Sequence, residues 1–249
     1  MPIRKTWLIQ FAEGLQRRLG SAPLRVALAS GCWLACGGPR GTEGGTSARG
    51  ETMRWGAADS SAPTILILGT SLTLGYGVPA SQSYPSLLQG KLDSVGLRYQ
   101  VVARGVPGER SDGVLKRFAA YAGFPVALLV LEIGANDARA GTEPDVIRRN
   151  IELALDSAAR IWPDARMIVA GISGPPSQQD DYGIALRDEF VRAAQARGTT
   201  LLPNLLQGVV GRPEFNQPDG VHPTARGHGV MAQNIWPVLE QVLRARAPD

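Results

Sequence analysis

The sequence predicts an α/β fold in which a parallel sheet of about five strands is covered by helices on both faces. Short apolar runs alternate along residues 63–249 with longer stretches that have helical spacing of apolar residues. Several of the short runs are continuously apolar, as expected of parallel strands that are buried on both faces. Regular alternation of strand and helix is typical of a single doubly wound domain.

Each predicted strand corresponds to a short apolar run in the sequence. We expect strands at residues 64–69, 99–105, 126–134, 166–172 and 199–204, the third being the most hydrophobic and therefore central. We expect helices at 83–96, 111–124, 143–163, 182–198 and 224–246, with Pro144 and Pro163 bounding the third. Since function in such sheets lies at the carboxyl ends of the strands, we expect the site in the loops that follow them.

Residues 1–62 differ in composition from the rest of the chain. Arginines 17, 18 and 25 precede an apolar run of residues 26–36, and a Gly-, Ser- and Thr-rich stretch follows it. The run suits a signal-peptide core and is too short to span a bilayer as a helix. We therefore expect a signal or lipoprotein-like segment at 1–36, a flexible linker at 37–62 and one domain at 63–249.

This N-terminal segment resembles a bacterial lipoprotein signal, which implies an exported protein in the periplasm or anchored to a membrane. Cys36, followed by two glycines, is the first candidate for the lipidated residue, and Cys32 is the second. A cleaved secretory signal and a frayed cytosolic extension remain open as alternatives.

The net charge of +4 arises in the same segment. Residues 1–62 hold eight of the 26 Lys and Arg and four of the 22 Asp and Glu, which leaves 18 of each in the remainder. The domain has no basic excess suited to nucleic acid, so we expect no nucleic-acid partner. It contains no cysteine, and His222 and His228 are its two histidines. We therefore expect neither a metal nor a cofactor.

Four loops carry the residues that could perform chemistry. They read GTSLTLGYG (69–77), GVPGERS (105–111), GANDARAG (134–141) and DGVHP (219–223). Loops at the carboxyl ends of parallel strands share one rim, so these side chains can converge. Ester hydrolysis by a serine needs a nucleophile, a base, a residue that orients the base and oxyanion donors. The four loops offer a candidate for each part.

Each loop taken alone has a plainer interpretation. A serine after a strand can be a helix cap, glycines can mark turns, Asn136–Asp137 can be a turn pair, and Asp219–His222 can be a surface ion pair. We expect His228 to be a helix residue without a role. Taken together, the four loops favour a hydrolytic site. The sequence has no G-x-S-x-G elbow and no G-x-G-x-x-G, which argues against an α/β-hydrolase and a dinucleotide site.

The blocks ILGTSLTLGYG, VVARGVPGERS, LEIGAND and DGVHP resemble, in order and spacing, those of the SGNH (GDSL-like) hydrolase superfamily. The resemblance covers residues 63–245 and is closest to the bacterial thioesterase/arylesterase/lysophospholipase branch. It implies a three-layer, flavodoxin-like α/β/α fold. It also implies Ser71 as nucleophile, His222 as base, Asp219 as the residue that orients it, and an oxyanion hole from the N–H groups of Ser71 and Gly108 and the Asn136 amide.

The sequence departs from the family pattern at three positions. Thr70 stands where the family has Asp, so a hydroxyl is expected to brace the loop, as a weaker anchor than a carboxylate. Pro107 replaces the usual Ser, and Arg110 stands where Thr is common, which alters the rim of the pocket. We expect Leu74, Tyr76 and the stretches 138–141 and 172–183 to shape the acyl pocket.

The resemblance implies a monomeric serine esterase that acts on small-molecule esters: aryl esters, acyl thioesters or lysophospholipids. A carbohydrate O-acetylesterase or acyltransferase with the same site is the first alternative. A non-catalytic envelope-binding lipoprotein that kept the fold is the second.

Overall fold

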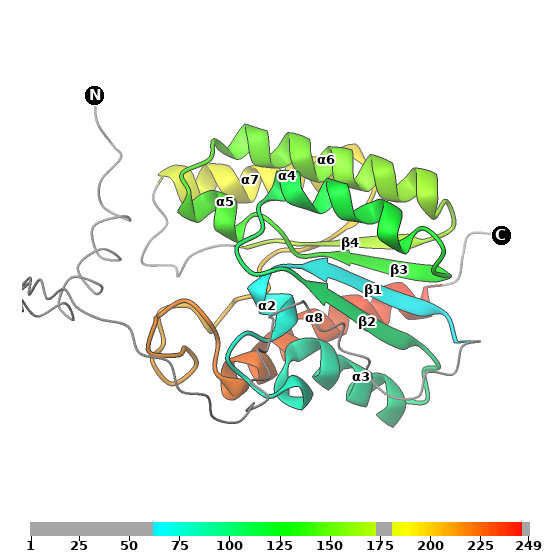
Figure 1. Cartoon of the computed structure of the whole chain (residues 1–249), viewed down its shortest axis with the longest axis horizontal. Helices are drawn as coiled ribbons and strands as arrows, with labels where there is room; N and C mark the ends of the chain where they lie inside the picture. The colour runs from blue at the N-terminus through cyan, green and yellow to red at the C-terminus, as the bar shows by residue number, and fades with distance from the viewer. Residues whose placement is uncertain (1–61, 173–180, 246–249) are drawn as a thin grey trace, which may run out of the picture. The chain divides into compact units, whose positions relative to one another are not determined.

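The computed structural model describes residues 62–172 and 181–245, and these residues form a five-stranded sheet with helices on both sides (Figure 1). All neighbouring strands are parallel, in the order β2-β1-β3-β4-β5. The strands are β1 (Thr64–Gly69), β2 (Gln100–Gly105), β3 (Val126–Leu131), β4 (Arg166–Ala170) and β5 (Thr200–Leu202). The fold class predicted from the sequence is confirmed.

Helices cover the two faces in separate groups (Figure 1). One face carries α3 (Tyr84–Ser94) and α8 (Ala225–Arg244), and the other carries α4 (Ser111–Val114), the 3-10 helix η2 (Leu115–Tyr121), α6 (Pro144–Ile161) and α7 (Asp181–Ala196). Three short elements lie in the loops: α2 (Ser71–Leu74), η1 (Ala80–Gln82) and α5 (Ala135–Arg139). Both α2 and α5 directly follow the carboxyl ends of strands.

The core consists of two apolar layers, one on each face of the sheet. Along β1, Ile65 and Ile67 point into the layer under α3 and α8, whereas Leu66 and Leu68 point into the layer under α6 and α7. Side chains of a strand alternate between faces, and here both faces are buried. This explains why the run 64–69 is continuously apolar in sequence.

The predicted helix at 111–124 is the largest difference in secondary structure. After one α-helical turn over Ser111–Val114 the chain continues as the 3-10 helix Leu115–Tyr121. Gly113 and Gly123 lie within or beside this stretch, and glycine disfavours the α-helical conformation.

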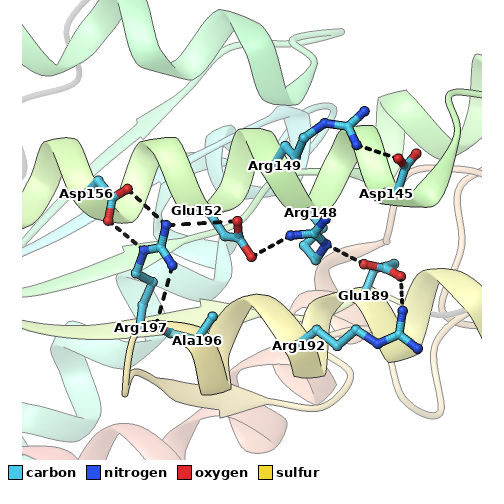
Figure 2. A network of polar contacts seen from close by, with 9 residues as sticks. All are labelled: Asp145, Arg148, Arg149, Glu152, Asp156, Glu189, Arg192, Ala196 and Arg197. Atoms are coloured by element: carbon cyan, nitrogen blue, oxygen red, sulfur yellow. Dashed lines mark hydrogen bonds and ion pairs between the residues drawn. The ribbon is translucent and has the colours of Figure 1, made fainter.

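An ion-pair network joins α6 to α7, the two long helices that cover one face of the sheet (Figure 2). Arg148 pairs with Glu152 at 2.8 Å and with Glu189 of α7 at 2.7 Å, and Arg197 pairs with Asp156 at 2.6 Å. Glu189 is 8% exposed and also binds Arg192. The charges of these helices therefore pair across their contact.

The predicted segment at 1–36, with Cys32 and Cys36, and all but the last residue of the predicted linker at 37–62 lie outside the described residues. Within the residues described, no helix is long and apolar enough to cross a membrane.

Candidate active site

The candidate residues gather where the first three strands end. β1 lies between β2 and β3, and its last residues pair with theirs: Gly69 lies opposite Gly105, and Leu68 lies opposite Leu131. The turn with Ser71, the loop with Gly108 and helix α5 with Asn136 therefore leave adjacent strands at one rim. In parallel sheets this rim is where ligands bind.

Ser71 is the first residue of α2, the single helical turn that follows β1. The turn closes through the N–H of Leu74, which donates to Thr70 O, and those of Gly75 and Tyr76, which donate to Ser71 O. It rests directly on Gly105, because a Cβ there would overlap Leu74 N and Thr70 O. Ser71 is 8% exposed, so it lies nearly buried at the edge of the sheet where the strands end.

Ser71, His222 and Asp219 form a continuous chain of polar contacts. Ser71 Oγ lies 3.1 Å from His222 Nε2, and His222 Nδ1 lies 2.6 Å from Asp219 Oδ2. A proton on Nδ1 donates to the carboxylate, which leaves the lone pair of Nε2 to accept from the serine hydroxyl. These three residues are 151 and three positions apart in sequence, and the fold brings them into contact.

The Asp219 carboxylate is organised by its own turn. Its Oδ1 accepts from the backbone N–H groups of Val221 at 2.9 Å and His222 at 3.0 Å. Partial burial raises the pKa of Asp219, but the hydrogen bonds from the His222 ring and from these N–H groups outweigh it, so that the pKa lies below its usual value. Asp219 is therefore ionised at neutral pH, as an acceptor for the imidazole must be.

Gln217 links the turn that carries Ser71 to the loop that carries His222. Its Nε2 donates to Tyr76 O at 2.8 Å and to Pro223 O at 2.9 Å, and its backbone N–H donates to His222 O at 2.7 Å. The ring of Tyr76 lies against that of His222, with 4.6 Å between centroids. Loops 141 residues apart in sequence are thus held together beside the imidazole.

Gly108 and Asn136 lie on the two loops that flank Ser71. Asn136 Nδ2 donates to Glu109 O at 2.8 Å, which ties α5 to the residue after Gly108 and leaves the second N–H of the amide for another acceptor. Gly108 has φ of +74°, and nothing lies within 4 Å of a Cβ built on it. Its glycine is therefore required by the backbone conformation. Neither residue hydrogen-bonds to Ser71, His222 or Asp219 in the described part of the chain.

Two sets of polar contacts hold these flanking loops, one buried and one partly buried. Asp137 accepts from Ser111 N at 2.8 Å and from Ser111 Oγ at 2.6 Å, which ties α5 to α4. Arg117 pairs with Glu109 at 2.6 Å and donates to Arg104 O and Gly69 O, at the ends of β2 and β1. Burial raises the pKa of Glu109, against the opposing effect of Arg117. The loops are thus fixed to each other as well as to the strands.

The Thr70 hydroxyl braces the turn that carries Ser71, as expected, and its partner is a carboxylate that was not expected. Thr70 donates to Glu132 through both its hydroxyl, at 2.9 Å, and its N–H, at 2.8 Å. The sequence reasoning also missed Gln217 and Arg117. Glu132 carried a signal, since a charged residue directly after an apolar strand in LEIGAND needs a buried partner.

Three further residues named from the sequence, His228, Tyr76 and Leu74, are described by the structure. His228 lies in α8, fully buried, and its Nδ1 accepts from Tyr84 N at 3.3 Å. Burial lowers its pKa to about 4, so it is neutral. Tyr76 is 49% exposed beside His222, while Leu74 is half-buried against Gly105. Most of the stretch 172–183, at 173–180, lies outside the described residues.

The described residues contain no cluster of three or more His, Cys, Asp or Glu side chains that could hold a metal ion. The chemistry that the group can perform is acyl transfer. A serine hydroxyl, an imidazole within hydrogen-bond reach and a carboxylate behind it are the parts that this reaction needs.

The comparisons with known proteins agree with this geometry. Residues 67–230 match the GDSL-like Lipase/Acylhydrolase family. The chain is 32% identical to Esterase TesA of Pseudomonas aeruginosa, covering 74% of this chain and 91% of the relative. It is also 32% identical to an arylesterase of Vibrio mimicus, covering 72% and 89%, and 31% identical to thioesterase 1/protease 1/lysophospholipase L1 of Escherichia coli, covering 69% and 79%.

Solved structures show the same relation. A crystal structure of TesA superposes with a TM-score of 0.68 at 32% identity, covering 72% of this chain and 99% of that one. The structure of AlinE4, an SGNH-hydrolase family esterase, gives a TM-score of 0.59 at 28% identity, covering 74% and 98%. The chain therefore belongs to the GDSL-like lipase/acylhydrolase family, the SGNH hydrolases, and is a carboxylic ester hydrolase.

Proposed function

We propose that Ser71 is the nucleophile of this esterase, with His222 as its base and Asp219 as the residue that orients the base. The observation that carries the proposal is the continuous chain from Ser71 Oγ through His222 to Asp219, with contacts of 3.1 and 2.6 Å. In the first step Ser71 Oγ attacks the acyl carbonyl carbon while His222 Nε2 takes its proton. The proton then passes to the leaving alcohol or thiol, and an acyl-serine remains.

Water completes the reaction at the same atoms. His222 Nε2 takes a proton from the water as its oxygen attacks the acyl-serine, and returns it to Ser71 Oγ when the acid leaves. The N–H groups of Ser71 and Gly108 and the second N–H of the Asn136 amide stabilise the oxyanion in both halves. The hydrogen bond from Asn136 to Glu109 O supports this role, because it orients the amide beside the Gly108 loop.

The substrates proposed are aryl esters, acyl thioesters and lysophospholipids. The relatives named as an arylesterase and as thioesterase 1/protease 1/lysophospholipase L1 support these classes. The half-exposed ring of Tyr76 next to His222 offers apolar surface to an acyl or aryl group.

Hydrolysis of p-nitrophenyl esters of increasing chain length, by wild type and Ser71→Ala, tests the function. We expect Ser71→Ala to lose about 10⁶-fold in kcat, since removal of a catalytic serine costs about that much. A fluorophosphonate should label wild type at Ser71 and leave the variant unlabelled. Wild-type rates in folded Ser71→Ala would overturn the proposal. Release of acetate from acetylated sugars without action on longer acyl esters would identify a carbohydrate O-acetylesterase.

We also propose that the domain 63–249 acts as an exported monomer, tethered through residues 1–62. The apolar run 26–36, Cys36 with its alternative Cys32, and the glycine-rich stretch after it support this proposal. Mass spectrometry of the mature N-terminus distinguishes a lipidated Cys36, a lipidated Cys32 and simple cleavage. Light scattering of residues 63–249 gives the oligomeric state.

A further inference from the structure

The carboxyl group of Glu132 lies beneath the turn that carries Ser71. Glu132 directly follows β3, and it is fully buried. Its oxygens accept from Thr70 N at 2.8 Å, Thr70 Oγ1 at 2.9 Å, Thr73 Oγ1 at 2.8 Å and Thr73 N at 3.3 Å. The two threonines lie on either side of Ser71 in sequence. One carboxylate therefore gathers both ends of the segment that contains the nucleophile.

The turn needs support of this kind because it is short. α2 has four residues, and a single helical turn is unstable by itself because nucleation costs more than one hydrogen bond returns. The direction of Ser71 Oγ depends on the backbone of residues 70–73, so the groups that hold this backbone also set the 3.1 Å contact with His222.

From these contacts we propose that Glu132 is a positioning residue for the nucleophile, which holds Thr70 and Thr73 so that Ser71 Oγ faces His222. The proposal rests on the proposed role of Ser71. Glu132 acts through the two threonines and touches neither substrate nor the reacting atoms.

The surroundings of Glu132 are shaped around the carboxylate. A Cβ on Gly69 would overlap Glu132 Oε2 and Thr73 Oγ1, so a side chain at position 69 would occupy the same space. Thr73 Oγ1 uses its proton for Glu132, and it therefore accepts from the hydroxyl of Tyr84 at 2.8 Å. This extends the contact to α3.

The charge state of Glu132 bears on how many of these contacts form. Burial raises its pKa to about 7, although the hydrogen bonds from Thr70 and Thr73 oppose this. The ionised carboxylate accepts from all four donors, whereas the protonated carboxyl must use one oxygen as a donor. Three titratable groups lie nearby: Tyr84 of α3, His228 of α8 behind Tyr84, and Arg117 of η2, which reaches Gly69 O. Burial, with Glu132 adding to it, raises the pKa of Tyr84, which remains neutral.

Steady-state kinetics of Glu132→Gln and Glu132→Ala between pH 5 and 9 test the proposal. An amide keeps one acceptor oxygen but no charge, so we expect Glu132→Gln to lose about tenfold in kcat with KM within about twofold. We expect Glu132→Ala to lose about 100-fold, which a misplacement of about 1 Å can cause. The ratio of wild-type kcat to Glu132→Gln kcat should rise through about pH 7, because a pH dependence that arises from His222 is common to both proteins and cancels in the ratio.

Stability gives a second readout, in which the expected effect of Glu132→Gln is opposite in sign to its effect on kcat. Because the pKa of Glu132 is raised above its ordinary value of 4.5, its contribution to stability is fully present below about pH 4.5 and is lost as pH rises through about 7. As pH rises from 5 to 8, the free energy of unfolding of Glu132→Gln should therefore increase relative to that of wild type, while its kcat remains lower. A purely structural residue would lower stability and leave kcat per folded molecule unchanged.

Two controls keep the outcome decisive. Glu189→Gln changes a carboxylate of similar burial in α7 and should leave kcat unchanged. If the Glu132 variants do not fold, Thr73→Val tests the same contact by removing the hydroxyl that donates to Glu132. Its control is Thr64→Val, which changes a buried threonine at the other end of β1. We expect a several-fold loss of kcat in Thr73→Val alone.

The failures of the two proposals are distinguishable. Loss of activity in Ser71→Ala together with wild-type kcat and pH profile in folded Glu132→Gln and Glu132→Ala overturns the role of Glu132 alone. Full activity in Ser71→Ala overturns the proposed nucleophile, and with it the basis for a positioning residue.

Discussion

The two halves of the candidate triad are held in different ways. The turn with Ser71 is buried, rests on Gly105 and is fixed from below by the fully buried Glu132. The loop with Asp219 and His222 lies at the surface, with side chains 43% and 18% exposed, and is fixed by hydrogen bonds within itself and by Gln217. The proposed nucleophile is thus positioned by the core, whereas the proposed base is positioned by a surface loop.

This difference indicates which half has the lower local stability. Local opening requires little free energy where few apolar contacts are buried and backbone hydrogen bonds are exposed. We infer that the loop 216–224 opens locally at low free-energy cost. The Ser71 turn, in contrast, opens only together with unfolding of the sheet. The following changes act on the two halves separately.

Asp219→Asn should have the largest effect of the changes to the loop. The amide cannot favour the required tautomer of His222, and we expect kcat to fall on the order of 10⁴-fold with little change in KM. Because the pKa of Asp219 is lowered, the wild-type carboxylate stays ionised from neutral pH down into the acid range, and the loss should persist at every pH where wild type is active. Asp164→Asn, in the exposed turn before β4, is the control. A loss below tenfold would show that Asp219 does not orient His222.

Asn136→Ala tests the part of the site that belongs to neither half. Removal of one oxyanion donor costs about 10²–10³-fold in kcat, and we expect a loss in this range with KM changed much less. The hydrogen bond to Glu109 O is lost as well, so thermal unfolding must be measured alongside. Activity within threefold of wild type would remove Asn136 from the oxyanion hole.

Gln217→Ala should change the position of the loop with His222 relative to the turn with Ser71. Without the contacts to Tyr76 O and Pro223 O, His222 is less well placed against Ser71, and we expect kcat/KM to fall about tenfold, less than a 1 Å misplacement can cost. Hydrogen exchange should become faster at residues 216–224 and remain unchanged at 70–75. Gln207→Ala, an exposed glutamine on the chain before this loop, should behave as wild type. Equal acceleration in both segments would contradict the comparison of the two halves.

Most of the fold could be predicted from the sequence because its signals are local. Each strand is a short apolar run, and α6 and α8 have long apolar stripes between clear boundaries. α2 and α5 have four and five residues, fewer than a periodic pattern needs to be visible. An apolar residue can also be exposed: Leu153 follows the buried Ile151 by two positions, so it points to another side of α6 and is 51% exposed.

The candidate residues could be named from sequence, but their supports could not. Asp219 and His222 are three positions apart, so one turn brings them together. Glu132 contacts Thr70 across 62 residues, and Gln217 contacts Tyr76 across 141. No local pattern pairs such residues, because the sheet order and the loop paths determine which polar groups meet. A single sequence therefore indicates the reacting groups more readily than the groups that orient them.

Thr224→Ala should have the smallest effect and is confined to the surface half. Thr224 caps α8, directly after the loop with His222, and its Oγ1 accepts from Gly227 N at 3.3 Å. Loss of an N-cap costs about 1 kcal/mol, and urea unfolding should show a decrease of that size. Thr224→Ser keeps the acceptor and should retain wild-type stability. We expect kcat to change by less than about threefold, since the contacts of Gln217 and Asp219 still hold His222. A loss of kcat as large as that of Gln217→Ala would mean that α8, and not the loop itself, positions the base.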